Sequence, residues 1–219
     1  MTLISSFKVV FFSALIAVTF SSCGTFSSPN TPEPKPNQTG EAVNPHPKGS
    51  YAAFKWNNYP GTTRAWKNEA LLEKANSSNS TVKIDIGDQR GFLMVGNEVA
   101  MDYRVSTGRR GKYDTPTGQY HVIEKSKDKR SNLYGKIFDA EGILVEDNAD
   151  ARKDEIPLGG KFVGSPMAYW MRLTNDGIGM HKGDVNSRYA SHGCIRSHSA
   201  AIPIIFEKTG VGTSVLIQP

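Results

Sequence analysis

The sequence predicts one mainly β domain with a few short helices, and three observations support this prediction. Residues 81–87, TVKIDIG, alternate apolar and polar side chains, as half-buried strands do. Residues 90–108, RGFLMVGNEVAMDYRVSTG, hold two apolar runs around Gly96 and Asn97, a pair suited to a hairpin turn. Hydrophobic residues make up 38% of the chain and charged residues 21%, a composition typical of a soluble globular domain.

The remaining elements follow the same reasoning. Further strands are expected in three short apolar runs: 119–125 (QYHVIEK), 169–174 (YWMRLT) and 212–218 (GTSVLIQ). Residues 200–210, AAIPIIFEKTG, are expected to form a helix, because Pro203 suits the first turn of a helix and Gly210 suits its end. The chain shows no internal repeat and no second core, so a single folded domain is expected.

The first 22 residues have the features of an export signal. Residues 9–20 form an apolar run that is too short to span a bilayer comfortably and is followed by small residues. The sequence FSSCG resembles a bacterial lipobox, which implies that Cys23 is lipidated and that the protein is exported and anchored to a membrane. Gly24, in the place where Asp would retain the protein, implies the outer membrane if the host is Gram-negative. The alternative is simple cleavage near Ser22, which leaves Cys23 as a free thiol.

Two segments are expected between the signal and the β domain. Residues 23–50 are rich in Pro, Ser, Asn and Thr and poor in large apolar groups, so they are expected to be a flexible tether. Residues 51–80 are expected to form an N-terminal helical element. In this element the apolar positions of 62–78 share one helical face, and Thr62 or Thr63 would cap the helix.

The charge balance is mildly basic. The chain has 26 Lys and Arg against 21 Asp and Glu, a formal net charge of +5. Such an excess suits an anionic surface or a substrate rich in carboxylates. Nucleic acid is not expected as a partner, because the sequence has no basic run and no stripe of basic and aromatic residues.

The stretch SHGCIRSH, residues 191–198, contains Cys194, one of the two cysteines of the chain. If Cys23 carries lipid, Cys194 has no disulfide partner, and an unpaired cysteine in an exported protein suits catalysis. A nucleophilic thiol needs a base and a nearby positive charge, and acyl transfer needs donors for the oxyanion. The neighbourhood offers a histidine base, a fixed positive charge and a flexible turn: His181, His192 or His198; Arg196; and Gly193.

Other interpretations of Cys194 are open at this point. A lone cysteine is commonly a buried small hydrophobe, although its polar neighbours here disfavour that role. The three histidines and Cys194 could surround zinc, but the CxxxH and HxC spacings lack the paired ligands of structural zinc sites. A papain-like hydrolase also combines cysteine and histidine, but its local signature and chain order differ.

Residues 179–196, GMHKGDVNSRYASHGCIR, resemble the active-site signature of the L,D-transpeptidase catalytic domain (YkuD) family. That signature is a histidine, a short loop, Ser or Thr, then His-Gly-Cys, an apolar residue and Arg or Asn. Residues 105–125, VSTGRRGKYDTPTGQYHVIEK, are similar to the family's STG and TPxG segment, and RSNLYG and PMAYWMRLTNDGIGMH also fit. The resemblance assigns residues 81–219 to a catalytic domain and implies the family's β-sandwich or barrel-like fold.

The resemblance also implies a reaction. Cys194 would attack the carbonyl of the third residue of a peptidoglycan stem peptide, usually a diamino acid, and release the terminal D-Ala, with His181 as the general base. An amine would resolve the thioester to give a 3→3 cross-link or an anchored protein, and water would give D,L-carboxypeptidase activity. The family needs no metal and no cofactor, and carbapenems commonly acylate its members.

Several other residues receive roles through the same resemblance. Backbone amides at and next to Gly193 would bind the oxyanion, and Ser191 and His192 would shape the pocket. Arg196 would hold the turn or a substrate carboxylate. Because the substrate carries carboxylates, Arg188 and Lys182 are further candidate partners, and the guanidinium fork of arginine suits a carboxylate best.

Four further positions and one alternative complete the predictions. Tyr134 and Met167 would line the groove for the donor peptide or belong to the core, and Arg109 and Arg110 are expected in a solvated loop. The alternative function is a non-catalytic, wall-binding lipoprotein of the same fold, because a small change in the Cys–His geometry would stop turnover. The sequence leaves the amine acceptor, the diamino acid and the oligomeric state open.

Overall fold

The computed structural model describes residues 43–56, 58–186 and 188–219. The chain divides into two compact units, Met1–Pro45 and His46–Pro219, and all elements described below lie in the second unit. The expected export signal, residues 1–22, and the expected lipidation site, Cys23, lie outside the described residues. Within the described ranges, no helix has the length and apolar character needed to cross a membrane.

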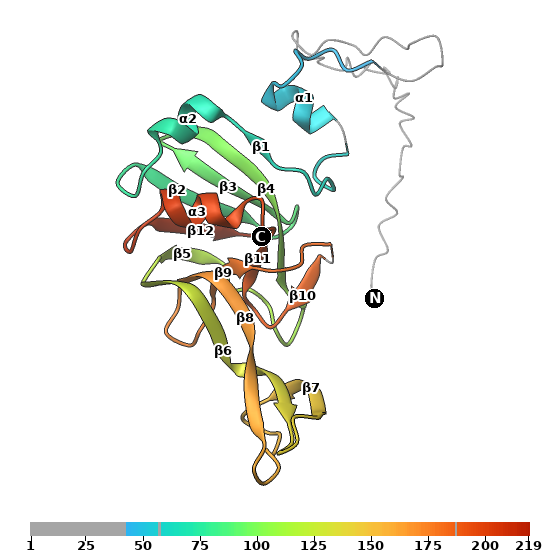
Figure 1. The fold of residues 1–219 in the computed structure, drawn as a ribbon. Helices are drawn as coiled ribbons and strands as arrows, with labels where there is room; N and C mark the ends of the chain where they lie inside the picture. The colour runs from blue at the N-terminus through green and yellow to red at the C-terminus, as the bar shows by residue number, and fades with distance from the viewer. Residues whose placement is uncertain (1–42, 57, 187) are drawn as a thin grey trace, which may run out of the picture. The chain divides into compact units, whose positions relative to one another are not determined.

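The second unit is mainly β, as the sequence predicts. Its strands form a mixed sheet in the order β5-β12-β2-β3-β4-β11-β9-β8-β6-β7, with β1 and β10 attached to β4 (Figure 1). The strands are β1 Trp66–Lys67, β2 Ser80–Asp85, β3 Arg90–Val95, β4 Glu98–Gly108, β5 Gly118–His121, β6 Glu124–Phe138, β7 Leu144–Asp150, β8 Lys161–Arg172, β9 Gly179–Lys182, β10 Tyr189–Ser191, β11 Ile195–Ser197 and β12 Ser214–Gln218. The helices of the described residues are α1 Tyr51–Trp56, α2 Glu69–Lys74 and α3 Ile202–Lys208.

The strands expected from local pattern are confirmed, with one division. β3 and β4 pair antiparallel around the expected turn, where Gly96 has a φ of +58°. The strand expected over 119–125 is divided into β5 and the start of β6. It divides because the chain changes partners there: β5 pairs with β12, whereas β6 pairs with β8.

The helix expected within 200–210 is confirmed as α3. Pro203 lies in its first turn, as expected, and its buried residues Ile202 and Ile205 join the hydrophobic core. Met171 of β8 and Met180 of β9 belong to the same core cluster. The core therefore covers one face of β8 and β9, and Trp170, Arg172 and His181 lie on the other face.

The helix expected over 62–78 is wrong in its first half. The chain there forms the short strand β1, whose backbone pairs with β4. The helix α2 begins only after Asn68, whose side chain accepts a hydrogen bond from the Leu71 amide at 3.2 Å. Asn68 is therefore the cap, in place of Thr62 or Thr63, and pairing with the sheet outweighs the helical periodicity ahead of it.

A buried ion pair ties the segment that contains α1 to the sheet. The side chains of Arg90 on β3 and Asp102 on β4 are fully buried and approach to 2.6 Å. Tyr51 of α1 donates its hydroxyl to Asp102 Oδ2 at 2.8 Å, and Arg90 Nη1 donates to the Thr62 carbonyl at 2.6 Å. Tyr51 and the Thr62 carbonyl thus supply partners that the buried charges need, because a buried charge without partners is costly. The segment from α1 onward is therefore part of the folded unit.

The strands β6, β7 and β8 form an arm. β6 and β8 pair antiparallel over most of their length and extend away from the rest of the unit, with β7 at the far end (Figure 1). β7 is the terminal strand of the sheet order and pairs with β6. The arm still contacts the rest of the unit through Tyr134 of β6, as described below.

Candidate active site

A tight turn at residues 191–194 positions Cys194. The Ser191 hydroxyl donates to the Cys194 carbonyl at 2.6 Å and accepts a hydrogen bond from the Gly193 amide at 3.1 Å. Gly193 has a φ of +112°, and a Cβ there would lie 2.5 Å from Ile178 Cδ1, so only glycine fits without strain. The turn thus depends on the small residue that the motif supplies.

The Thr115 hydroxyl also stabilises this turn through two hydrogen bonds. Its hydroxyl donates to the Gly193 carbonyl at 2.7 Å and accepts a hydrogen bond from the Gly108 amide at 2.9 Å. Thr115 is 5% exposed. Thr115 belongs to the TPxG-like segment of the sequence, and its side chain connects the end of β4 to the turn that carries Cys194.

Two short parallel strands place Cys194 and His181 on one face. In the register of β9 and β11, Ile195 lies beside Met180, and Arg196 lies beside His181. Ile195 and Met180 are buried in the core. Because side chains alternate along a strand, Cys194, His181 and Arg196 share the opposite face.

A backbone carbonyl orients the His181 ring. His181 Nδ1 lies 2.7 Å from the Lys182 carbonyl, which can only accept, so Nδ1 carries the proton and Nε2 of the neutral ring is the acceptor. Burial lowers the pKa of His181 to about 4, the hydrogen bond to Lys182 opposes this, and Arg196 adds to it. His181 is therefore neutral at pH 7 and able to accept a proton.

Cys194 is held as a thiol in the resting site. Burial raises its pKa, whereas a hydrogen bond from the Gly179 amide and the charges of Arg196 and Arg172 oppose the rise. Its Sγ lies 3.7 Å from the Gly177 carbonyl. A neutral thiol and a neutral imidazole on one face of the sheet can exchange a proton when the sulfur attacks an electrophile.

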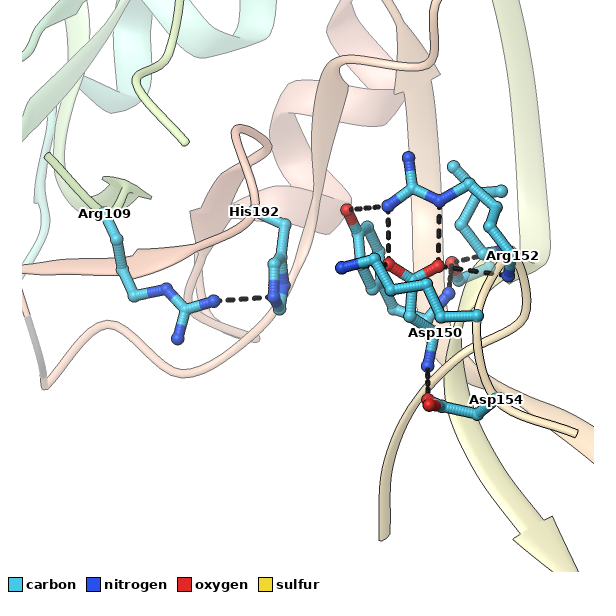
Figure 2. A network of polar contacts seen from close by, with 9 residues as sticks. Arg109, Asp150, Arg152, Asp154 and His192 are labelled. Atoms are coloured by element: carbon cyan, nitrogen blue, oxygen red, sulfur yellow. Dashed lines mark hydrogen bonds and ion pairs between the residues drawn. The ribbon is translucent and has the colours of Figure 1, made fainter. Parts of the chain in front are cut away.

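His192 is enclosed by aromatic rings and an arginine. Its ring stacks on Tyr134, with ring centroids 4.0 Å apart and planes 13° apart, and meets the edge of Tyr113 at 4.5 Å. Arg109 Nη2 donates to His192 Nε2 at 2.6 Å (Figure 2). Burial, followed by the charge of Arg109, lowers the pKa of His192. Arg109 is exposed, as expected for a solvated loop, but it also holds the His192 ring in place.

The arm holds Tyr134 through a second arginine. Arg152 Nη2 donates to the Tyr134 hydroxyl at 2.9 Å, and its Nε and Nη2 donate to the two oxygens of Asp150 at 2.8 and 2.7 Å. The Asp150 amide donates a hydrogen bond to Asp154 Oδ2 at 2.6 Å (Figure 2). The hydrogen bond from Arg152 holds the pKa of Asp150 well below its usual range. Polar and stacking contacts thus connect the arm to the turn beside Cys194.

Comparison with known proteins agrees with this geometry. The family model described as the L,D-transpeptidase catalytic domain, YkuD, matches residues 79–217, more than half of the chain. The chain belongs to this family. No curated protein sequence matches the chain.

Solved L,D-transpeptidases are similar to this family member at low identity. An L,D-transpeptidase from Mycobacterium smegmatis is 19% identical, with 64% of this chain and 59% of that chain covered and a TM-score of 0.48. A mutant Enterococcus faecium L,D-transpeptidase is 23% identical, with 65% and 50% covered and a TM-score of 0.46. L,D-transpeptidase 1 of Mycobacterium tuberculosis is 19% identical, with 64% and 62% covered and a TM-score of 0.44. This chain therefore spans half to about three fifths of the length of these proteins.

The other residues of this YkuD domain that are expected to bind substrate do not all lie near Cys194 and His181. Arg196 is half-buried beside His181. Arg188 is exposed, and its Nη2 donates to the Gly87 carbonyl. Met167 is half-buried in β8 opposite Lys129. Among the contacts of the described residues, none joins Arg188 or Met167 to the Cys194–His181 pair.

Two arginines of the YkuD site were missed by sequence reasoning. Arg109 donates a hydrogen bond to His192, which lies 83 positions away in the sequence. Arg172, on β8, lowers the pKa of Cys194 through its positive charge. The only signal for Arg172 was its place in the family-like stretch 166–181. No group of three or more His, Cys, Asp and Glu in the described part of the chain is arranged to hold a metal ion.

Proposed function

We propose that this protein is a peptidoglycan L,D-transpeptidase in which Cys194 is the nucleophile and His181 the general base. The observation that carries the proposal is the state of His181. Its Nδ1 is committed to the Lys182 carbonyl, and its Nε2 is an acceptor on the face that it shares with Cys194. Membership of the YkuD family supports the choice of substrate.

In the first half of the reaction, the Cys194 sulfur attacks the carbonyl carbon of the third residue of a stem tetrapeptide. The thiol proton passes to His181 Nε2 as the C–S bond forms. The tetrahedral intermediate then collapses, the bond to the D-Ala nitrogen breaks, and the imidazolium returns its proton to the leaving amine. Free D-Ala and a thioester on Cys194 are the products.

In the second half, an acceptor amine attacks the thioester carbonyl and gives its proton to His181. The C–S bond breaks, and the thiol is regenerated. A side-chain amine of another stem peptide would give a 3→3 cross-link, a protein amine would give anchoring, and water would give carboxypeptidase activity. Nothing in the described site favours one of these acceptors.

The charge that develops on the carbonyl oxygen needs donors. The Gly193 amide donates to Ser191 Oγ at rest, so it would have to exchange this partner for the oxyanion, and the adjacent Cys194 amide is the second candidate. Arg196, beside His181, would hold a carboxylate of the substrate. His192 would form a wall of the pocket, together with Tyr134.

We also propose the location of the enzyme. Residues 1–22 would direct export, Cys23 would carry the lipid, and residues 23–50 would let the domain of 81–219 reach the wall. The segment 51–80 would belong to the same folded body, because Tyr51 and β1 contact β4.

The decisive experiment uses the full chain in detergent with a purified stem tetrapeptide that contains diaminopimelate, next to Cys194→Ala. Mass spectrometry should show loss of D-Ala, with a cross-linked dimer, in the wild-type protein only. Release without a dimer would indicate a carboxypeptidase. An intact tetrapeptide would favour the wall-binding lipoprotein, provided that Cys194 also forms no adduct with imipenem, a carbapenem found in complex with an LD transpeptidase of similar structure.

A further inference from the structure

Four exposed cations lie on the two segments that lead to the turn of Cys194. The loop after β4 carries three of them, and the fourth directly precedes β10. Together they form what we call the basic surface: Arg109, Arg110, Lys112 and Arg188. β10 pairs with the end of β4, with Ser191 beside Gly108. The two segments therefore lie side by side, next to the turn that carries the proposed nucleophile.

Two tyrosine rings hold these cations in place. The distances from cation to ring centroid are 4.5–5.7 Å: Arg109 and Lys112 lie over Tyr113, and Arg110 and Arg188 lie over Tyr189. Arg110 Nη2 also donates a hydrogen bond to the Tyr189 hydroxyl at 2.8 Å. Because these contacts restrict the side chains, less conformational entropy is lost when the cations bind a ligand.

No carboxylate of the described residues neutralises the basic surface, since none of its four side chains forms an ion pair with them. Asp114, the acid of the same loop, accepts a hydrogen bond from a backbone amide at 3.1 Å. Among these residues Lys112 Nζ makes no hydrogen bond, and Arg110 uses only Nη2. Burial, followed by the charge of Arg188, lowers the pKa of Arg104. Positive charges thus crowd here, and a bound anion would relieve their repulsion.

The basic surface borders a pocket that is separate from the reaction centre. This pocket, of about 640 Å³, is lined by Arg110 and also by Gly108 and Thr115, which take part in holding the turn of Cys194. Neither Cys194 nor His181 lines it. A ligand held at Arg110 can therefore lie beside the turn without displacing a substrate from the nucleophile.

We propose that the basic surface binds the carboxylates of stem peptides other than the one that reacts, and so holds the enzyme on the cell wall. A guanidinium binds a carboxylate through two parallel hydrogen bonds. Several cations in one array favour a repeating polyanion over a single carboxylate, because each further contact strengthens the same attachment. Attachment to the wall would also raise the local concentration of substrate. This inference rests on the proposed substrate, peptidoglycan, but does not require turnover.

The test measures sedimentation of the full chain in detergent with purified peptidoglycan sacculi, in a Cys194→Ala parent that cannot turn over. Adding Arg110→Gln with Lys112→Gln should raise the apparent Kd about tenfold at low salt. Adding Lys67→Gln with Lys74→Gln instead removes the same charge from exposed positions outside the basic surface and should leave the Kd nearly unchanged. Sacculi whose carboxylates have been converted to amides should bind the parent and both variants equally weakly.

Turnover of a soluble stem tetrapeptide separates this inference from the proposed function. With Cys194 intact, Arg110→Gln with Lys112→Gln should leave kcat/KM for D-Ala release unchanged. Equal binding of sacculi by the parent and this variant would overturn the inference and leave the transpeptidase intact. No D-Ala release, with charge-dependent binding of sacculi retained, would overturn the proposed function alone. If the variant loses binding only to phosphatidylglycerol vesicles and not to sacculi, the basic surface belongs to a membrane contact and the inference is wrong.

Discussion

The buried, neutral His181 predicts a specific dependence of stability on pH. Its pKa is about 4 in the folded chain, against 6.5 for an ordinary histidine. As the pH falls below about 6.5, the unfolded chain takes up a proton that the folded chain does not, so the free energy of unfolding decreases. The loss is complete once the pH is below about 4. At about 1.4 kcal/mol per pH unit, the two pKa values correspond to a loss of about 3 kcal/mol.

The variant His181→Gln isolates this contribution, because glutamine does not titrate. Urea unfolding of the wild type and the variant should be compared at pH 7 and at pH 4. Between pH 7 and pH 4, the wild type should lose about 3 kcal/mol more of its unfolding free energy than His181→Gln does. Other acidic groups titrate in both proteins and cancel. Parallel pH dependences would show that His181 has an ordinary pKa and would refute the reasoning.

The same pKa makes a kinetic prediction for the site. If neutral His181 accepts the Cys194 proton, acylation of the full chain by imipenem should lose rate only as the pH falls toward about 4. Intact-protein mass spectrometry over a pH series measures this limb. An acid limb near pH 6.5 would indicate that another base acts.

Three other perturbations follow from the structure. Asp102→Ala leaves the fully buried Arg90 without its carboxylate, so the unit should lose about 3–5 kcal/mol in thermal unfolding, and a loss below about 1 kcal/mol would contradict the burial of that pair. Gly193→Ala places a side chain at a φ of +112°, so it should lower the stability by about 1–3 kcal/mol. It should also abolish the imipenem adduct in intact-mass spectra, and normal acylation would show that the turn adapts. Tyr134→Ala removes the ring stacked 4.0 Å from His192 and should increase hydrogen exchange in the arm, whereas Tyr134→Phe keeps the ring and should change exchange little; equal effects would assign the contact to the hydroxyl.

The local elements of the fold were predictable where the signal lies within a few residues. The turn at Gly96 and Asn97 and the helix around Pro203 required only neighbouring residues, and both are present. The helix expected over 62–78 failed because β4 offers a backbone partner to β1, and no local pattern reveals this pairing. Long-range pairing thus decided the one element in which periodicity misled.

The candidate site was predictable only in part for the same reason. Cys194, Gly193 and His181 stand in one continuous signature, so sequence alone identified them as candidates. Arg109 and Arg172 come from separate strands or loops, and their relation to the site depends on sheet register and on contacts between distant segments. Single charged residues in a sequence carry no mark of such contacts.

The group that orients His181 has a consequence for mutational tolerance. It is a peptide carbonyl, at Lys182, and every amino acid provides one at that position. Saturation mutagenesis of position 182 should therefore leave the Cys–His pair functional, although a member of its hydrogen-bond chain lies there. The Lys182 side chain is exposed and free to diverge. The backbone of β9 places this carbonyl, whichever residue stands at position 182. A comparison of residue identities across homologues would therefore not detect the group that orients His181.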